Sequence, residues 1–213
     1  MGESPKFEHP PTPEEGEEVF TSEEKGELYL QRSEYLLEQL DTDPLTGAKS
    51  RVAFQAELSR ALRFVRKEMD AHRAGIEPIG EVSVVFIDLD NFGQVNKSLG
   101  HHEGDEILKK VVKLIKDAVR EMDTVGRFGG DEFLALLPRA TEEIAVKRAH
   151  AILANLQADT RLQELRVGAS IGVCSSTEST DDTEIVHFAD KASREAKQGG
   201  KNQVRVYKGE RGT

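Results

Sequence analysis

The chain has 213 residues, of which 37% are hydrophobic, and its formal net charge is −10. No apolar run is long enough to cross a bilayer, and no basic start precedes an apolar segment at the N-terminus, so we expect a cytoplasmic protein without a membrane anchor. The acidic balance argues against binding along a nucleic acid polymer, although single nucleotides need only a few well-placed cations. One cysteine, Cys174, excludes an internal disulfide and is expected as a half-buried strand thiol.

The N-terminal part differs in composition from the rest. Residues 1–20 hold four of the seven prolines and many glutamates, which predicts a disordered acidic tail. Thr21 and Glu24 fit a capping box that would open a helix over residues 21–41. That helix either pairs with a second copy or packs on its own domain. We therefore assign residues 21–41 to a signalling or dimerisation helix, 42–208 to one domain and 209–213 to a flexible end.

The first half of the domain has clear periodic patterns. "DTDPLTG" breaks the N-terminal helix, and a long amphipathic helix follows, with its apolar face at Val52, Phe54, Leu58, Leu62 and Val65. Residues 82–90, "VSVVFIDLD", predict a central strand because they are rich in β-branched side chains. A short helix, a glycine turn and a long helix follow. Two strands over 123–128 and 133–138 flank "GGDE".

The second half predicts a helix over 141–157 capped by Thr141, a strand over 165–176, a helix over 182–201 that ends in glycine, and a strand over 202–208. A strand, helix, hairpin, helix, strand core is the split βαβ arrangement. The fold class is therefore α+β, a ferredoxin-like or palm fold preceded by an N-terminal helix. Its sheet should be mainly antiparallel with helices on one face.

The hairpin carries the first chemical signal. Gly129 and Gly130 fit a turn that needs positive φ, but a solvated turn does not require the carboxylates of Asp131 and Glu132. If the strand that contains Asp88 lies beside this hairpin, Asp88 and Asp131 meet at one edge of the sheet. Two adjacent carboxylates repel each other unless a cation lies between them. An oxygen-only site suits Mg²⁺, which serves phosphoryl or nucleotidyl transfer.

Further polar groups favour a bound phosphate. Backbone N–H groups at 91–93 lie at a helix start, and Lys197 and Lys201 lie near a helix end. Each of these has an ordinary explanation: a turn, a solvated face, or a cation that stabilises the helix dipole. Their joint occurrence points to a nucleoside triphosphate bound with a metal ion.

The motifs "DPLTG", "FIDLDNF", "GHHEGDEIL", "RFGGDEF", "SIGV" and "AKQGGKN" together resemble the GGDEF domain of bacterial diguanylate cyclases, over about residues 41 to 208. The resemblance implies a signalling nucleotidyltransferase that joins two GTP into the second messenger cyclic di-GMP and releases two pyrophosphates. It also implies a homodimer, because each of two facing domains holds one GTP.

The resemblance also implies roles for single residues. Asp88, Asp131 and the Leu89 carbonyl match the ligands of Mg²⁺ or Mn²⁺. Asp131 matches the base that activates the 3′-hydroxyl, with Glu132 beside it. Asn96 and Asp105 match contacts to the guanine edge, where donors and acceptors distinguish guanine from adenine. The full set of expected substrate contacts is Asn91, Phe92, Gly93, Asn96, His101, Asp105, Gly129, Gly130, Lys197 and Lys201.

Arg120 and Asp123 resemble the inhibitory site of the family, where the product cyclic di-GMP binds. An arginine fork suits guanine or phosphate oxygens, and a carboxylate suits the guanine N–H edge. The alternative for these two residues is an ion pair at a helix end.

Departures from the family pattern leave a second function open. Gly93 stands where the family usually has a lysine credited with stabilising the transition state, and Arg194 stands where a tyrosine is usual. The signature acids are intact, so we expect an active cyclase, but a slow one. The alternative is a GGDEF domain with little activity that acts as a cyclic di-GMP receptor. The activating signal is unassigned, and an upstream protein regulator is one candidate.

Overall fold

The computed structural model describes Gly26, Tyr29 and residues 41–73 and 80–209. The chain divides into two compact units after Asp41, and the fold below is that of the second unit, which begins at Thr42. The tail predicted over 1–20 and nearly all of the helix predicted over 21–41 lie outside the described residues, as do positions 210–213.

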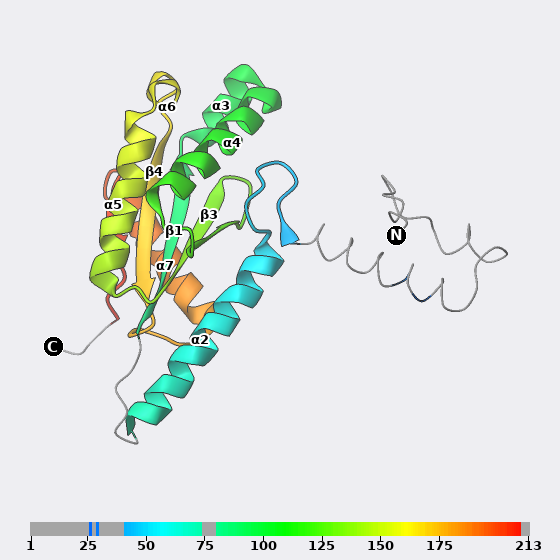
Figure 1. The fold of residues 1–213 in the computed structure, drawn as a ribbon. Coiled ribbons are helices and arrows are strands. Elements are labelled where there is room, and N and C mark those ends of the chain that lie inside the picture. The colour runs from blue at the N-terminus through cyan, green and yellow to red at the C-terminus, as the bar shows by residue number, and fades with distance from the viewer. Residues whose placement is uncertain (1–25, 27–28, 30–40, 74–79, 210–213) are drawn as a thin grey trace. The chain divides into compact units, whose positions relative to one another are not determined.

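A five-stranded sheet forms the centre of the domain (Figure 1). Its strands follow the spatial order β2-β3-β1-β4-β5. All neighbours are antiparallel except β4 and β5, which run parallel. The predicted split βαβ fold with a mainly antiparallel sheet is therefore confirmed. The strands are β1 (Val82–Asp90), β2 (Thr124–Arg127), β3 (Glu132–Pro138), β4 (Gly168–Ser175) and β5 (Val204–Val206).

Six helices are described in this unit, and five of them were expected from the sequence. The helix over 160–164 was not predicted; its first turn is capped by the Asp159 carboxylate, which accepts the N–H of Leu162 at 3.0 Å. The helices are α2 (Arg51–Arg73), α3 (Phe92–Leu99), α4 (His101–Ala118), α5 (Glu142–Ala158), α6 (Thr160–Glu164) and α7 (Asp182–Gln198). The described residues contain no helix that is long and apolar enough to span a membrane.

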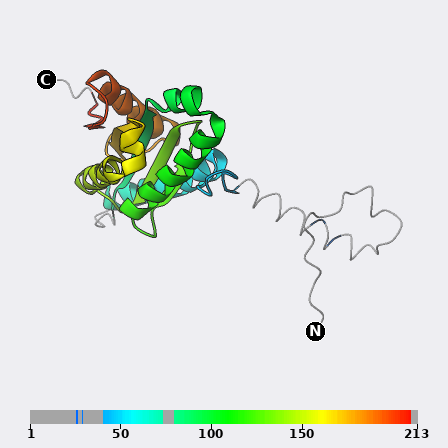
Figure 2. The ribbon, with the colours of Figure 1, turned by 90° about the horizontal axis from the view of Figure 1, so that it is seen from above.

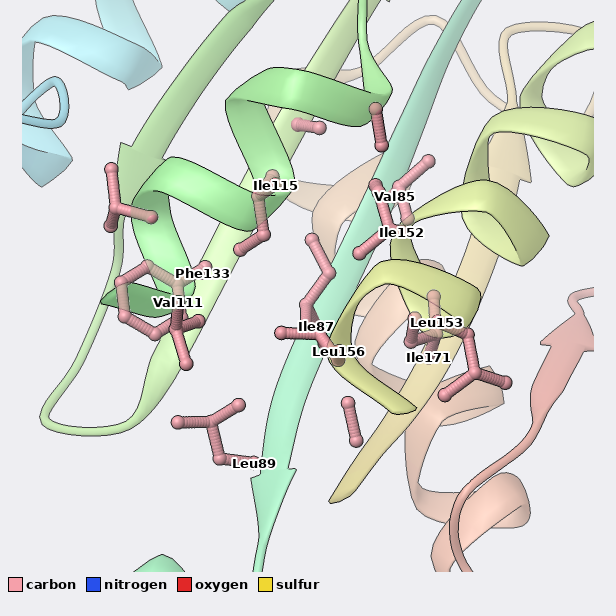
Figure 3. Close-up of a cluster of buried hydrophobic side chains, with 14 of the residues drawn as sticks. Val85, Ile87, Leu89, Val111, Ile115, Phe133, Ile152, Leu153, Leu156 and Ile171 are labelled. Atoms are coloured by element: carbon pink, nitrogen blue, oxygen red, sulfur yellow. The ribbon is translucent and has the colours of Figure 1, made fainter. Parts of the chain in front are cut away.

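Helices cover both faces of the sheet, so the expectation of helices on one face was wrong (Figures 1 and 2). Val85, Ile87 and Leu89 of β1 pack against α4 and α5, as the close-up in Figure 3 shows. Val84 and Phe86 face the other way and belong to the cluster formed with α2 and α7. Because side chains alternate along a strand, a strand that is apolar at every position needs a cover on both sides.

The buried face of α2 differs from its prediction at one position. Phe54, Leu58, Leu62 and Val65 are buried, but 68% of Val52 is exposed. Val52 precedes Phe54 by two residues, which is about 200° around a helix, so it lies on the opposite face.

Local signals at other positions agree with the structure. The Thr141 hydroxyl accepts the N–H of Ile144 at 3.4 Å and so caps α5 as predicted. Helix α7 ends before Gly199. Cys174 in β4 is fully buried rather than half-buried, and this burial raises the pKa of its thiol to about 12.

Helix α7 lies directly on β4 because Gly172 has no side chain. A Cβ at Gly172 would lie 1.9 Å from the backbone oxygen of Ala189 and 2.4 Å from the nitrogen of Ser193. This close approach fixes the height of α7 above the sheet. It thereby fixes the position of Lys197 in the last turn of that helix.

Candidate active site

Three carboxylates gather at one edge of the sheet. Asp88 near the end of β1 stands opposite Glu132 at the start of β3 in the antiparallel register. The N–H of Leu89 donates to the backbone oxygen of Asp131 at 3.1 Å, which ties the hairpin turn to β1. The sequence expectation that Asp88 and Asp131 lie near each other therefore agrees with the geometry.

Lys197 of α7 is the cation of this cluster, and its Nζ lies 2.6 Å from an Asp88 oxygen. Burial raises the pKa of Asp88 above its ordinary value; the charges of Asp131 and Asp90 add to this, and Lys197 partly offsets it. Burial also raises the pKa of Glu132, with further contributions from Asp88 and Asp131. Crowded carboxylates with raised pKa values are poised to receive a cation or a proton.

The donor set at this edge fits a hard metal ion. Within the described ranges, no group of three or more His, Cys, Asp or Glu side chains is placed to hold a metal by itself. Asp88 and Asp131 offer two carboxylates, and the backbone carbonyl of Leu89 is adjacent in sequence. Mg²⁺ is commonly held by one or two carboxylates plus substrate phosphates, so these residues fit Mg²⁺ bound together with a nucleotide.

The two glycines of the hairpin have a different reason from the one predicted. Neither Gly129 nor Gly130 has positive φ, so the expected left-handed turn was wrong. A Cβ at Gly129 would lie 2.4 Å from a carboxylate oxygen of Glu132, whereas Gly130 faces open space. Gly129 is therefore required by the position of the Glu132 carboxylate.

Arg127, which the sequence analysis did not single out, holds the hairpin turn. Its guanidinium donates to the Gly129 carbonyl at 3.2 Å and to the Gly130 carbonyl at 2.8 Å. It also contacts both oxygens of Asp43 in the "DPLTG" loop, at 3.2 and 3.3 Å. The loop that follows the N-terminal segment is thus bonded through one side chain to the turn that carries Asp131. An arginine before a glycine pair and a buried aspartate upstream are the only sequence signals for this link.

The predicted guanine contacts lie where α3 meets α4. Asn96 of α3 packs against Gly104 in the first turn of α4, and a Cβ there would lie 2.0 Å from Asn96 Oδ1. That Oδ1 is buried and has no hydrogen-bond partner in the described part of the chain. Asp105 is the next residue and is half-buried, while His101 at the start of α4 is exposed. A buried, unpaired amide oxygen is costly, so it marks a place for a ligand that donates a hydrogen bond.

The other predicted phosphate contacts surround the end of β1. Lys201 Nζ donates to Asn91 Oδ1 at 2.9 Å. Phe92 is buried, and Gly93 is exposed with nothing near the position of a Cβ. Asp90, which we did not predict as a site residue, is 2% exposed and organises this region: its oxygens accept from the Ser170 hydroxyl and the Asn202 N–H, each at 2.9 Å.

Arg120 and Asp123 lie before β2, at the end of that strand remote from the hairpin turn. The Asp123 carboxylate accepts the backbone N–H of Arg120 at 2.7 Å. No ion pair joins the two side chains in the described structure, so the alternative of a helix-end ion pair is not what the geometry shows. The Arg120 side chain is exposed and projects from a hydrogen-bonded turn.

Comparison with known proteins identifies the family. Residues 40–203 match the family profile described as "Diguanylate cyclase, GGDEF domain". The chain is 35% identical over 176 residues to the diguanylate cyclase TpbB of Pseudomonas aeruginosa, and the alignment covers 80% of this chain but 38% of TpbB. The chain thus matches well under half the length of that relative.

Two solved structures share the fold. The isolated GGDEF domain of TpbB matches with a TM-score of 0.68 at 34% identity, covering 79% of this chain and 95% of that one. The diguanylate cyclase SiaD of Pseudomonas aeruginosa, solved in complex with its activator SiaC, matches with a TM-score of 0.65 at 28% identity. That match covers 86% of this chain and 68% of SiaD. Because the family profile spans nearly the whole domain described above, this chain belongs to the GGDEF family.

Proposed function

We propose that this protein is a diguanylate cyclase, which condenses two GTP into cyclic di-GMP and two pyrophosphates. The observation that carries the proposal is the convergence of Asp88, Asp131 and Glu132 at one sheet edge beside Lys197. The match to relatives named as diguanylate cyclases supports the same activity.

The bond changes define what the site must do. The 3′-oxygen of one GTP attacks the α-phosphorus of the other, and the bond from that phosphorus to the bridging oxygen of the β-phosphate breaks. Pyrophosphate leaves, and the proton of the 3′-hydroxyl passes to Asp131, beside which Glu132 stands. The same exchange in the opposite direction closes the ring. When bound by Asp88, Asp131 and the Leu89 carbonyl, Mg²⁺ or Mn²⁺ would neutralise phosphate charge.

The remaining predicted contacts divide the nucleotide between two regions. Asn96 and Asp105 would bind the guanine edge, with His101 nearby, and the unpaired Asn96 Oδ1 supports this assignment. Lys197, Lys201 and the backbone at Asn91, Phe92 and Gly93 would hold phosphates. These residues lie on the same side of the β1 end as the acids, as one extended substrate requires.

Regulation has two proposed routes. Product would bind at Arg120 and Asp123, where the exposed guanidinium and the ordered turn suit the inhibitory role. Residues 21–41 would pair two copies, since a single domain supplies only half of a two-GTP site. An upstream protein regulator is a further proposal, which the activator complex of SiaD supports.

A second function is favoured by Gly93 alone. Gly93 is exposed and faces open space, so no cation stands at the position where the family usually has one. Loss of one such electrostatic contact can lower a rate on the order of a hundredfold. A domain with that deficit could bind cyclic di-GMP as a receptor with little turnover.

The test is to incubate the purified protein with GTP and Mg²⁺ and to measure cyclic di-GMP by chromatography. We expect product from the wild type, none from Asp131→Ala, and an unchanged rate from Asp117→Ala, which removes an exposed carboxylate from α4. Intact GTP in the presence of a high protein concentration would instead favour the receptor function.

A further inference from the structure

A cavity of about 390 Å³ lies beyond the end of β1, next to the proposed phosphate contacts but apart from the three acids. Residues from β1, from α5 and α6, from the start of β4 and from the turn between α7 and β5 line it. Asn91, Arg166, Lys201 and Asn202 give it a polar and basic side, and Leu156 and Leu162 give it an apolar one. No role has yet been given to this cavity.

The backbone around the cavity is held in an unusual conformation. Asn91, Arg166, Lys201 and Asn202 have φ angles of 65°, 55°, 64° and 48°. They are four of the five non-glycine residues with positive φ in the described chain, and the fifth, Arg139, follows β3 at the other end of the sheet. Side chains disfavour this region of φ, so such residues concentrate where a site requires them.

Short contacts hold these residues together. The Asn91 amide donates to the Arg166 carbonyl at 3.0 Å and accepts from Lys201 Nζ at 2.9 Å. The Asn202 N–H donates to the buried carboxylate of Asp90 at 2.9 Å. Asn91 therefore places two basic residues, Lys201 and Arg166, on either side of its own amide.

The charges form a row that leads away from the acids. Lys197 pairs with Asp88, and Lys201, one helical turn further along the chain, contacts Asn91, three residues beyond Asp88. Arg166 follows Lys201 across the Asn91 amide. Among the residues that the structure describes, no acceptor pairs with the Arg166 guanidinium. Both oxygens of the one acid that lines the cavity, Asp90, are already hydrogen-bonded.

We propose that Arg166 and Lys201 form a binding site for the terminal phosphates of the nucleoside triphosphate. This inference rests on the proposed function, which places the α-phosphate at the acids and so directs the β- and γ-phosphates toward this row of cations. An arginine fork donates to two phosphate oxygens at once. Arg166 would thus supply positive charge at the phosphate end of a site in which Gly93 supplies none.

The test compares a triphosphate with a monophosphate in equilibrium binding to the full chain, by calorimetry with a non-hydrolysable GTP analogue and with GMP, both with Mg²⁺. Arg166→Asn removes the charge and keeps a residue that tolerates positive φ. We expect the affinity for the GTP analogue to fall about 10- to 100-fold and the affinity for GMP to stay unchanged. Arg166→Lys should recover part of the loss, because it restores the charge without the fork.

Arg139→Asn is the matched control, since Arg139 is also an exposed arginine with positive φ, at 53°, but lies far from the cavity along the sheet. It should bind both nucleotides as the wild type does. Equal affinity of Arg166→Asn and wild type for the GTP analogue would overturn the inference, and so would an equal loss for GMP. If the wild type binds neither nucleotide, the proposed function fails first, and that result is distinct from a failure of Arg166 alone.

Discussion

Single atoms decide the shape of the proposed guanine site. Asn96 Oδ1 lies in the space that a Cβ at Gly104 would fill, so a glycine inside α4 is required by a side chain of α3. Gly129 has the same relation to the Glu132 carboxylate. In both cases a glycine in the sequence reflects the space taken by a polar side chain and not a special backbone angle.

Replacing Gly104 with alanine should therefore damage the site although alanine favours helices. The added Cβ would meet Asn96 Oδ1 at 2.0 Å and must displace it. We expect a loss of about 1–3 kcal/mol in the free energy of unfolding from overpacking, and weaker GTP binding. Urea unfolding and nucleotide titration measure the two effects.

Gly93→Ala is the control for stability, because Gly93 lies in α3 with nothing near its Cβ position. Alanine should stabilise that helix by up to about 1 kcal/mol. If Gly104→Ala also gained stability and bound GTP like the wild type, the contact with Asn96 would have no importance for the site.

At the scale of elements, Arg127 connects the "DPLTG" loop to the hairpin turn. Partial burial raises the pKa of Asp43, but hydrogen bonds from Thr46 and Arg127 outweigh it, so the pKa lies below the ordinary value of 3.8. The folded state thus favours the ionised carboxylate. The stability that Asp43 contributes is present above pH 3.8 and is lost as the pH falls through the lower pKa of the folded state.

Asp43→Asn should remove this contribution. We expect the variant to be less stable than the wild type by about 1–3 kcal/mol at pH 7, since hydrogen bonds to a charged group are lost. The difference should shrink at pH 3 and below, where the wild-type carboxyl becomes protonated. Urea unfolding at several pH values measures it, with Asp117→Asn as an exposed control. A difference that stayed constant with pH would contradict the assigned charge.

At the scale of the whole molecule, the described domain presents one set of acids and one set of proposed guanine contacts. Joining two GTP needs two such sets that face each other, so the reaction is expected only in a pair of domains. Binding of one GTP needs only one domain.

The rate per protein molecule should therefore rise with protein concentration and reach a plateau when the pair is fully formed. GTP binding per chain should not change over the same range. Initial rates from a dilution series, compared with nucleotide titrations at the same concentrations, test this expectation. A rate per molecule that is independent of concentration down to the lowest dilution would indicate a pre-formed tight pair or a different reaction.

Much of the fold could be predicted because its signals are local. Residues 82–90 form a strand with the predicted bounds, because nine consecutive residues of strand-forming and buried type leave little choice. Thr141 caps α5, and α7 ends before Gly199, for similar short-range reasons. The chemical types at the site, two acids after a strand and two in a hairpin, were also visible in the sequence.

The errors arose where residues distant in sequence decide the outcome. Helices cover both faces of the sheet, because the apolar residues of β1 alternate between two clusters and periodicity alone did not reveal the second cover. Gly129 avoids the Glu132 carboxylate, and Val52 lies on the exposed side of α2.

The sequence by itself therefore determined the order of elements, the sheet topology and the acids of the site, since these depend on composition, short spacings and motif order. Only the tertiary structure decided which groups touch. It placed Lys197 on Asp88, Arg127 between Asp43 and the hairpin, and Arg166 beside Lys201. These pairs are separated by many residues along the chain, and only the packing of helices on the sheet brings them within hydrogen-bonding distance.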